Sequence, residues 1–295
     1  MRLNKYYLAA FTAFVIWGFF SLVLKPLQHY ASLDIIFYRI FYATVLLLGI
    51  NLIFRKKILK NDLLVLKGMD AKARYRTFFL TIIGGFLLIV NWFLFIYAVN
   101  HVSLKSASFA YLICPIITTI LAYFILKEKL GKWQWFAVGL SLISCVLLSF
   151  GSIRDLVYSL VIALSFAFYL ITQRKNNQFD RFVVLTVQMV IAAIVVLPFF
   201  PKYSGEVPTA ALFYTMLTLI VVVFTIIPLF LNLYALKGMN SSAVGILMYI
   251  NPLINFFLAV FYFHEAIDAL QLISYAIIML SVIIFNGKFF LPKAG

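Results

Sequence analysis

The sequence predicts an all-α integral membrane protein in which ten transmembrane helices form two inverted five-helix repeats. Three observations lead to this prediction. The chain of 295 residues is 65% hydrophobic and only 11% charged, whereas a soluble domain is roughly 45–50% apolar and about 25% charged. Apolar runs long enough to cross a bilayer recur along the whole chain. One segment of the sequence occurs twice, which indicates a duplicated unit.

The duplicated segment is 97–134, which aligns without a gap to 234–271 when the sequence is shifted by 137 residues. The alignment contains 10 identities in 38 positions, against roughly a tenth expected by chance from an apolar-rich composition. Two identical pairs carry extra weight because their residue types are scarce in this chain. These pairs are Pro115 with Pro252 and Glu128 with Glu265.

Taken in order, the apolar runs predict the helices that cross the membrane. The predicted spans are 6–24, 33–54, 77–99, 106–126, 133–150, 156–173, 182–200, 210–234, 243–263 and 270–287. The first run is too long for a signal-peptide core and is expected to stay as a helix. The domains 1–150 and 151–295 each carry five spans, so an odd number of helices forces the second copy to enter the membrane upside down. Secondary transporters share this arrangement, with the solute site at mid-membrane between the halves.

The net charge of +15 would suggest a nucleic-acid partner in a soluble protein, but its distribution follows membrane topology instead. Alternate loops and termini hold 19 Lys and Arg on one side and 4 on the other. The positive-inside rule therefore predicts that both termini are cytoplasmic, and no nucleic acid is expected as a partner. The long basic loop 55–76 either lies as an amphipathic segment on the anionic inner leaflet or is an ordinary charged connector.

Arg39 is the one basic residue predicted inside a span, about 9 Å from the outer end of its helix. Charge at that depth requires a partner or a wet cavity, and the nearby helix N-terminus disfavours a cation. Two explanations remain open. Arg39 either anchors an anionic or zwitterionic solute, or it pairs with Asp34 or extends to the outer interface.

Pro115 and Pro252 fall near the middle of two matching spans. Each proline deprives the carbonyl four residues earlier of its helical donor, which is expected to free Tyr111 C=O and Met248 C=O. Interrupted helices at matching positions of two halves point to a transporter site, although membrane helices also carry prolines as simple kinks. The pairing favours a helix break with a gating role at both prolines.

Other polar and aromatic side chains at this level are candidates for solute contact. Amides either line a cavity or bond neighbouring helices together, and aromatic rings can stack on a planar or apolar solute. With Arg39, the predicted substrate-binding residues are Trp17, Tyr38, Asn91, Trp92, Tyr111, Tyr249, Asn251 and Asn255.

Missing motifs limit the chemistry. The sequence has no phosphate-binding GxxxxGK[ST] loop and no HExxH or Cys/His cluster, so we expect no ATP motor, metal or cofactor. Cys114 and Cys145 both lie in apolar runs and suit neither a disulfide nor a metal site. An intramembrane enzyme would need buried acids, histidines or an activated nucleophile, so we expect a protein that is not an enzyme.

The two five-span halves resemble the EamA domains of the drug/metabolite transporter superfamily. The resemblance rests on the run Ala122 to Glu128 and on its counterpart from Ala259 to Glu265. Further segments are similar to the RarD branch: Leu24 to Leu27, Tyr38-Arg39, Asn91-Trp92, Tyr97 to Asn100 and Tyr249 to Pro252. The sequence departs from that branch where Cys114 replaces an expected Asn before Pro115.

The resemblance implies a multi-pass permease of the cell (inner) membrane that exports small metabolites such as amino acids or drug-like solutes. We expect a small-molecule solute and the lipid bilayer as its partners, and a central cavity between the repeats. The alternatives are a flippase or accessory protein for a lipid-linked intermediate and, third, an intramembrane enzyme.

Overall fold

The computed structural model describes residues 5–101, 104–148, 153–262, 264 and 269–290. Within these residues the protein consists of helices joined by turns, and no strand occurs. Helices suit this composition because lipid offers no hydrogen bonds, so each spanning segment must satisfy its own backbone groups. The predicted all-α class is therefore confirmed for the described part of the chain.

The helices of residues 1–150 follow the predicted apolar runs with small differences. The first run divides near Gly18, and the loop 55–76 contains a helix of its own. These helices are α1 (Lys5–Gly18), α2 (Phe20–Leu24), η1 (Lys25–Leu27), α3 (Ser32–Phe54), α4 (Lys56–Gly68), α5 (Ala71–His101), α6 (Leu104–Leu126) and α7 (Lys132–Leu148).

The helices of residues 151–295 show two interruptions. A π-helical turn, η2 (Val222–Ile226), divides one predicted span, and a short break after Leu247 divides the next. The remaining helices are α8 (Ile153–Lys175), α9 (Arg181–Val196), α10 (Phe200–Tyr203), α11 (Ala211–Val221), α12 (Ile227–Gly238), α13 (Ser241–Leu247), α14 (Ile250–Phe261) and α15 (Ala269–Phe290).

Seven helical segments of the described chain are long and apolar enough to cross a membrane, and three shorter apolar helices cover 110–126, 132–148 and 181–196. All ten coincide with predicted spans. The protein is thus a multi-pass membrane protein, whereas the number of ten crossings stays a prediction.

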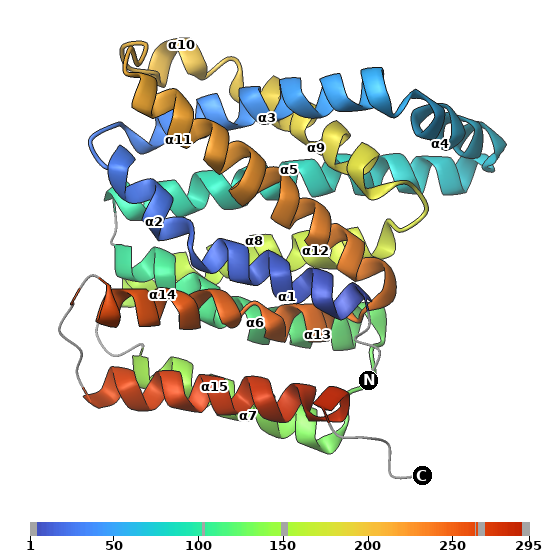
Figure 1. Ribbon diagram of the computed structural model, residues 1–295. Coiled ribbons are helices and arrows are strands. Elements are labelled where there is room, and N and C mark those ends of the chain that lie inside the picture. Colours follow the sequence, from blue (N-terminus) through green and yellow to red (C-terminus); the bar gives the residue numbers. More distant parts are fainter. Residues whose placement is uncertain (1–4, 102–103, 149–152, 263, 265–268, 291–295) are drawn as a thin grey trace.

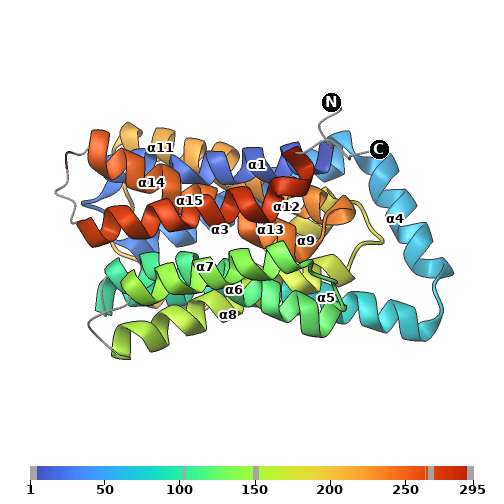
Figure 2. The same ribbon diagram turned by 90° about the horizontal axis from the view of Figure 1, so that it is seen from below.

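The long helices run side by side and give a layered bundle (Figures 1 and 2). Helix α3 packs on α9, α6 packs on α8 and α13, α1 packs on α12, and α7 pairs with α15 at one edge. Helices α1 and α15 respectively begin and end at the end of the bundle that carries α4. We call this end the α4 end.

Helix α4 projects from the bundle at this end (Figure 2), and none of its residues is buried. It contains the apolar run Leu63 to Leu66 beside several lysines. The expected amphipathic segment is therefore helical, and its contact with lipid stays a prediction. The loop is shorter than predicted because α5 begins at Ala71, where Asp70 Oδ1 accepts a hydrogen bond from Ala73 N at 3.3 Å.

Candidate functional site

Arg39 extends from α3 toward α5 and the α11–α12 segment. Its Nε donates a hydrogen bond to Thr225 Oγ1 at 2.6 Å. The guanidinium carbon lies 4.3 Å from the ring centroid of Trp92 and 5.5 Å from that of Phe20. Aromatic faces attract a cation, but they do not neutralise its charge. The guanidinium contacts a hydroxyl and two rings, none of which carries a negative charge. Its positive charge is therefore available to an anion.

Asp34 does not pair with Arg39. Its carboxylate accepts a hydrogen bond from Gly205 N at 3.0 Å. Among the described residues the ion pair within 4 Å joins Arg55 to Asp180 at 3.1 Å. Arg39 therefore has no acidic partner in the described chain, and its bond to Thr225 directs it into the bundle rather than to the outer interface.

Thr225 accepts from Arg39 because of a local distortion in its helix. Pro228 has no N–H, so the carbonyl of Phe224 lacks its usual donor four residues later. The indole Nε1 of Trp17 donates to that carbonyl at 3.0 Å. The single hydroxyl proton of Thr225 is donated to Ile220 O at 2.8 Å, which leaves the oxygen as an acceptor.

Sequence reasoning missed Thr225 and Pro228. A threonine three residues before a proline inside an apolar span was the available signal, but neither residue has a counterpart of its own type at the matching position of the first half. Pro228 therefore does not belong to a pair of matching prolines, and the sequence repeat does not point to it. π-Helical turns are frequent at functional sites, and this one positions both Trp17 and Arg39.

The two predicted tyrosines near Arg39 have different neighbours. Tyr111 of α6 lies within electrostatic reach of the guanidinium. Tyr38 instead meets Phe200 and Phe213 edge-on, at centroid distances of 5.8 and 5.5 Å. Tyr38 thus belongs to a separate aromatic cluster. We define the Arg39 group as Arg39, Thr225, Trp17, Trp92 and Tyr111.

Asn91 lies next to Trp92 in sequence but faces α8. Its Nδ2 donates to Ile162 O and to Ser165 Oγ, both at 3.0 Å, and the side chain is fully buried. Amides of this kind hold membrane helices together. The structure therefore gives Asn91 an interhelical contact, and the predicted contact with solute is untested.

The helix that carries Pro252 breaks between α13 and α14. The sequence predicts a free Met248 carbonyl, but Asn251 N donates to it at 3.1 Å. Asn255 Nδ2 donates to Asn251 Oδ1 at 2.7 Å, so the two amides pair with each other. Tyr249 is fully buried, and its hydroxyl lies beside Ser141 of α7.

The helix that carries Pro115 does not break, and the predicted interruption there is wrong. Helix α6 is continuous through the proline. The proline removes the one backbone bond to Tyr111 O, and the helix continues on both sides of it. Thr119 Oγ1 donates to Pro115 O at 2.8 Å, and Cys114 Sγ donates to Ala163 O of α8 at 3.5 Å.

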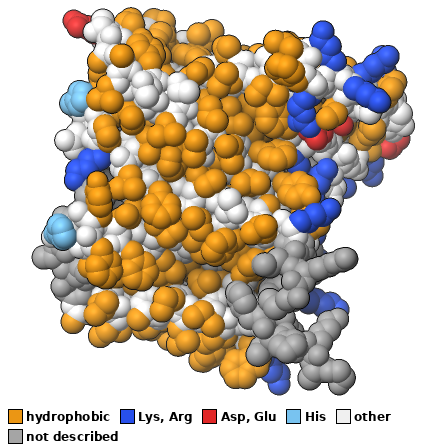
Figure 3. Space-filling view, in the orientation of Figure 1, with side chains coloured by type: hydrophobic (Ala, Val, Ile, Leu, Met, Phe, Trp, Pro, Cys, Tyr) orange, Lys and Arg blue, Asp and Glu red, His pale blue; other side chains and the backbone are white. Residues whose placement is uncertain are grey.

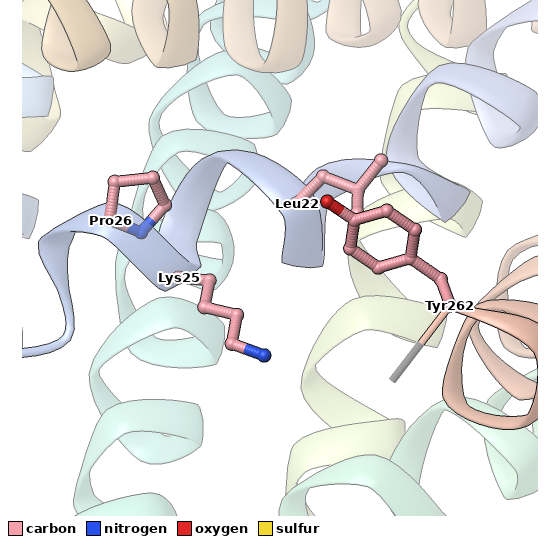
Figure 4. A pocket seen from close by; sticks show the side chains of 4 residues that line it. All are labelled: Leu22, Lys25, Pro26 and Tyr262. Atoms are coloured by element: carbon pink, nitrogen blue, oxygen red, sulfur yellow. The ribbon is translucent and has the colours of Figure 1, made fainter. Parts of the chain in front are cut away.

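A pocket of about 330 Å³ opens at the end of the bundle opposite α4 (Figures 1 and 4). Leu22, Lys25, Pro26 and Tyr262 line it, and the Lys25 and Tyr262 side chains extend into the space between η1 and the end of α14. No predicted site residue lines this pocket. It is therefore an end pocket and not the central cavity that the sequence predicts.

Contacts at the α4 end join residues 1–150 to residues 151–295. The Glu128 carboxylate accepts from Ser241 N at 2.7 Å, Ser242 N at 3.0 Å and Ser242 Oγ at 2.6 Å. It thus caps α13 from the end of α6, where the positive end of a helix dipole favours a carboxylate. Arg55 and Asp180 also join the halves here. Glu265, the repeat counterpart of Glu128, lies outside the described residues.

The described residues contain no group of three or more His, Cys, Asp or Glu side chains that could hold a metal ion. The Arg39 group offers a cation, hydroxyls and aromatic faces. Its chemistry is that of binding a polar or anionic organic molecule.

Comparisons with known proteins identify the family of this chain. The model of the EamA-like transporter family matches residues 4–150 and 154–287. The uncharacterized transporter YojE of Bacillus subtilis (strain 168) is 30% identical over 93% of this chain and 91% of its own length. Protein RarD of Salmonella typhi is 28% identical over 94% of this chain and 93% of its own.

A protein of known crystal structure superposes with a TM-score of 0.76 over 97% of this chain and 98% of that one. At 14% identity this likeness shows the fold alone. The two matched stretches of the family model together span nearly the whole sequence, and the Bacillus subtilis relative is named as a transporter. The chain therefore belongs to the EamA-like transporter family, as a RarD-like membrane transporter of the drug/metabolite transporter superfamily.

Proposed function

We propose that this protein is a ten-span permease of the cell (inner) membrane that exports small carboxylate-bearing metabolites, such as amino acids. The solute crosses by alternating access between the inverted repeats 1–150 and 151–295. The observation that carries this proposal is Arg39, an arginine inside a span without an acidic partner among the described residues. A solute carboxylate supplies the missing charge.

The helix packing supports inverted repeats. We exchange each span of the first half with the corresponding span of the second. The most extensive helix–helix contacts then correspond to other helix–helix contacts of the structure. The α1–α12 contact becomes the α5–α8 contact, and the α6–α8 contact becomes the α1–α14 contact. The pairs α3–α9, α6–α13 and α7–α15 map onto themselves, as expected for helices on both sides of a two-fold axis.

The distribution of charge supports cytoplasmic termini. Lys and Arg gather at the α4 end, and His side chains lie at the opposite end (Figure 3). The face between the two ends is covered by apolar side chains. A bilayer around this apolar band leaves the basic α4 end in the cytoplasm by the positive-inside rule.

The Arg39 group suits a solute with one carboxylate and an apolar body. Thr225 occupies Nε, and no described acceptor occupies the two terminal nitrogens of the guanidinium. These nitrogens form the planar fork that binds a carboxylate through two parallel hydrogen bonds. Trp17, Trp92 and Tyr111 offer rings to the rest of the solute.

The contacts at the two ends favour a conformation closed to the cytoplasm. Glu128 and Asp180 join the halves at the α4 end, and the pocket beside Lys25 opens at the other. Alternating access requires the first set of contacts to break when the cytoplasmic side opens. The relatives named as transporters are consistent with such a cycle.

Transport by purified protein in proteoliposomes tests this proposal. With a radiolabelled mixture of amino acids, Arg39→Ala is expected to lower flux at least about tenfold, because a charged hydrogen bond contributes about 1.5–3 kcal/mol. Arg39→Lys keeps the charge but loses the fork, so its flux should lie between that of Arg39→Ala and that of the wild type.

The exposed Arg74 on α5 gives a matched control, and Arg74→Ala should transport normally. Full flux in Arg39→Ala, or its absence from the membrane, would make Arg39 a structural residue. A wild-type protein that moves neutral apolar solutes but no carboxylates would contradict the substrate class.

A further inference from the structure

Two glutamines meet inside the bundle, on the α4 side. Gln173 of α8 and Gln188 of α9 are both fully buried. A Cβ on Gly84 of α5 would collide with the amide nitrogens of both, so the two amides lie together over the backbone of this glycine. Neither the oxygen nor the nitrogen of either amide has a hydrogen-bond partner among the described residues.

Two more side chains with unpartnered atoms lie beside these amides. Tyr169, one turn before Gln173 on the same face of α8, is fully buried, and its hydroxyl has no described partner. Arg181, at the start of α9, is only 1% exposed. Its Nη1 donates to Asn176 O and, at 3.4 Å, to Gln173 O, whereas its Nε and Nη2 donate to no described acceptor.

This concentration of unpartnered atoms is unusual. Buried polar groups are almost always hydrogen-bonded, and a buried charge without a partner is costly. The sequence places Arg181 in a charged cytoplasmic connector, but the structure buries it. Side chains that serve only to hold helices together would bond one another or the backbone, as Asn51 does with Thr186 at 2.6 Å. The cluster instead presents donors and acceptors for a molecule that does not belong to the chain.

The repeat relates this cluster to Arg39. Arg39 lies seven residues after the start of α3, and Gln188 lies seven residues after the start of α9. Helices α3 and α9 are counterparts in the proposed repeat. Arg39 faces the α11–α12 segment, and Gln188 faces α5 at Gly84 and Gly85. The two-fold operation of the proposed repeat exchanges α3 with α9 and α12 with α5. It therefore places the glutamine cluster at the position that corresponds to the Arg39 group.

We propose that Gln173, Gln188, Tyr169 and Arg181 form a second solute subsite on the cytoplasmic side of the pathway, the two-fold counterpart of the Arg39 group. Its guanidinium Nε and Nη2 take the solute carboxylate, and the amides and the phenol bond the solute's other polar atoms. The subsite is collapsed while the α4 end is closed and receives solute when that end opens. This inference rests on the proposed transport function.

The double variant Gln173→Leu/Gln188→Leu tests the subsite. Because no described hydrogen bond is lost, the variant should keep the wild-type Tm or exceed it. In proteoliposomes given the radiolabelled amino acid mixture, the KM measured from the cytoplasmic face should rise about tenfold. The KM from the outer face should change less than about twofold.

Asn51→Leu is the matched control, since it removes a buried amide whose Nδ2 is bonded to Thr186 Oγ1 and Leu47 O. It should lower the Tm and leave the KM on both faces unchanged. An unchanged cytoplasmic KM in the glutamine double variant, with active wild type, would overturn the subsite alone. A wild-type protein that transports no amino acid would overturn the proposed function.

Labelling tests access to the subsite without a transport assay. Gln188→Cys should react with a membrane-impermeant maleimide in inside-out vesicles and not in right-side-out vesicles. The wild-type protein, which keeps Cys114 and Cys145, is labelled in parallel, and its signal is subtracted from that of the variant. Equal labelling from both faces, or none from the cytoplasmic face, would overturn the subsite.

Discussion

The two proline-bearing helices lie at matching positions of the repeated sequence segment, but they differ in backbone. Helix α6 passes Pro115 without a break, whereas the helix around Pro252 divides into α13 and α14. In the first, Thr119 and Cys114 supply side-chain bonds to carbonyls. In the second, the backbone tightens into three-residue bonds. These are Met248 N to Gly245 O at 3.0 Å, Tyr249 N to Ile246 O at 3.2 Å and Asn251 N to Met248 O at 3.1 Å.

This difference shows that a proline does not decide alone whether a membrane helix breaks. The residue types around the two prolines differ. A threonine four residues after Pro115 bonds back to its carbonyl, whereas the matching position in the second copy is Phe256. A continuous helix and an interrupted helix are therefore in contact, because α6 packs on α13. We expect movement between the halves to use the joint before Pro252.

Removal of the joint should have the largest effect. Pro252→Ala restores an N–H inside the helix, and a proline at such a position costs about 3 kcal/mol. We expect a continuous helix and a flux in proteoliposomes that falls between about tenfold and a hundredfold. Pro115→Ala should change the flux less than about threefold, because α6 is already continuous.

Both variants should be present in the membrane at wild-type abundance. Equal losses of flux in the two variants would show that the broken and the continuous helix contribute alike to transport. The break before Pro252 would then have no special role in movement between the halves.

The contact between the two proline helices gives the next prediction. Glu128 caps α13 with three hydrogen bonds to Ser241 and Ser242. Glu128→Ala should destabilise the protein by about 1–2 kcal/mol, since it removes a cap and a favourable charge at a helix N-terminus. The corresponding loss in Tm is about 2–8 °C.

Glu128→Gln keeps part of the bonding and should lose less. The fluorescence-monitored Tm of the purified protein measures both variants. Exposed Lys127 is the matched control, and Lys127→Ala should melt as the wild type does. A Tm that Glu128→Ala leaves unchanged would show that this closure contributes nothing to the folded state.

The sequence predicted the helices well because hydropathy alone determines which segments lie in lipid. Arg39 was found for the same reason, as a charge inside an apolar run. Thr225 and Arg181 were not. Thr225 matters because Pro228 and a π-helical turn leave its oxygen to Arg39, and neither feature has a counterpart of the same type in the first half. Arg181 follows an acidic residue at a loop end, and only the packing of α8 against its side chain buries it.

The amides were the hardest to assign. Asn91, Asn51 and Asn255 are polar residues in apolar runs, and the sequence cannot distinguish a bonded amide from an unpartnered one. The structure separates them by their partners: Asn91 bonds α8, and Asn255 bonds Asn251. These hydrogen-bond partners depend on which helices are neighbours. The sequence pattern of a single helix does not predict its neighbours.

The smallest predicted effects come from exchange of the residues before the two prolines. Asn251→Cys removes the oxygen that accepts from Asn255 Nδ2 at 2.7 Å, and a net hydrogen bond contributes about 1 kcal/mol. Cys114→Asn puts an amide donor of similar volume where a thiol donates weakly to Ala163 O, and because the amide can take over that bond the change in stability should be within about 1 kcal/mol. The Tm should fall for Asn251→Cys and stay close to wild type for Cys114→Asn. If Cys114→Asn also divided α6, seen as faster hydrogen exchange at 114–118, then the residue before the proline would be enough to break the helix.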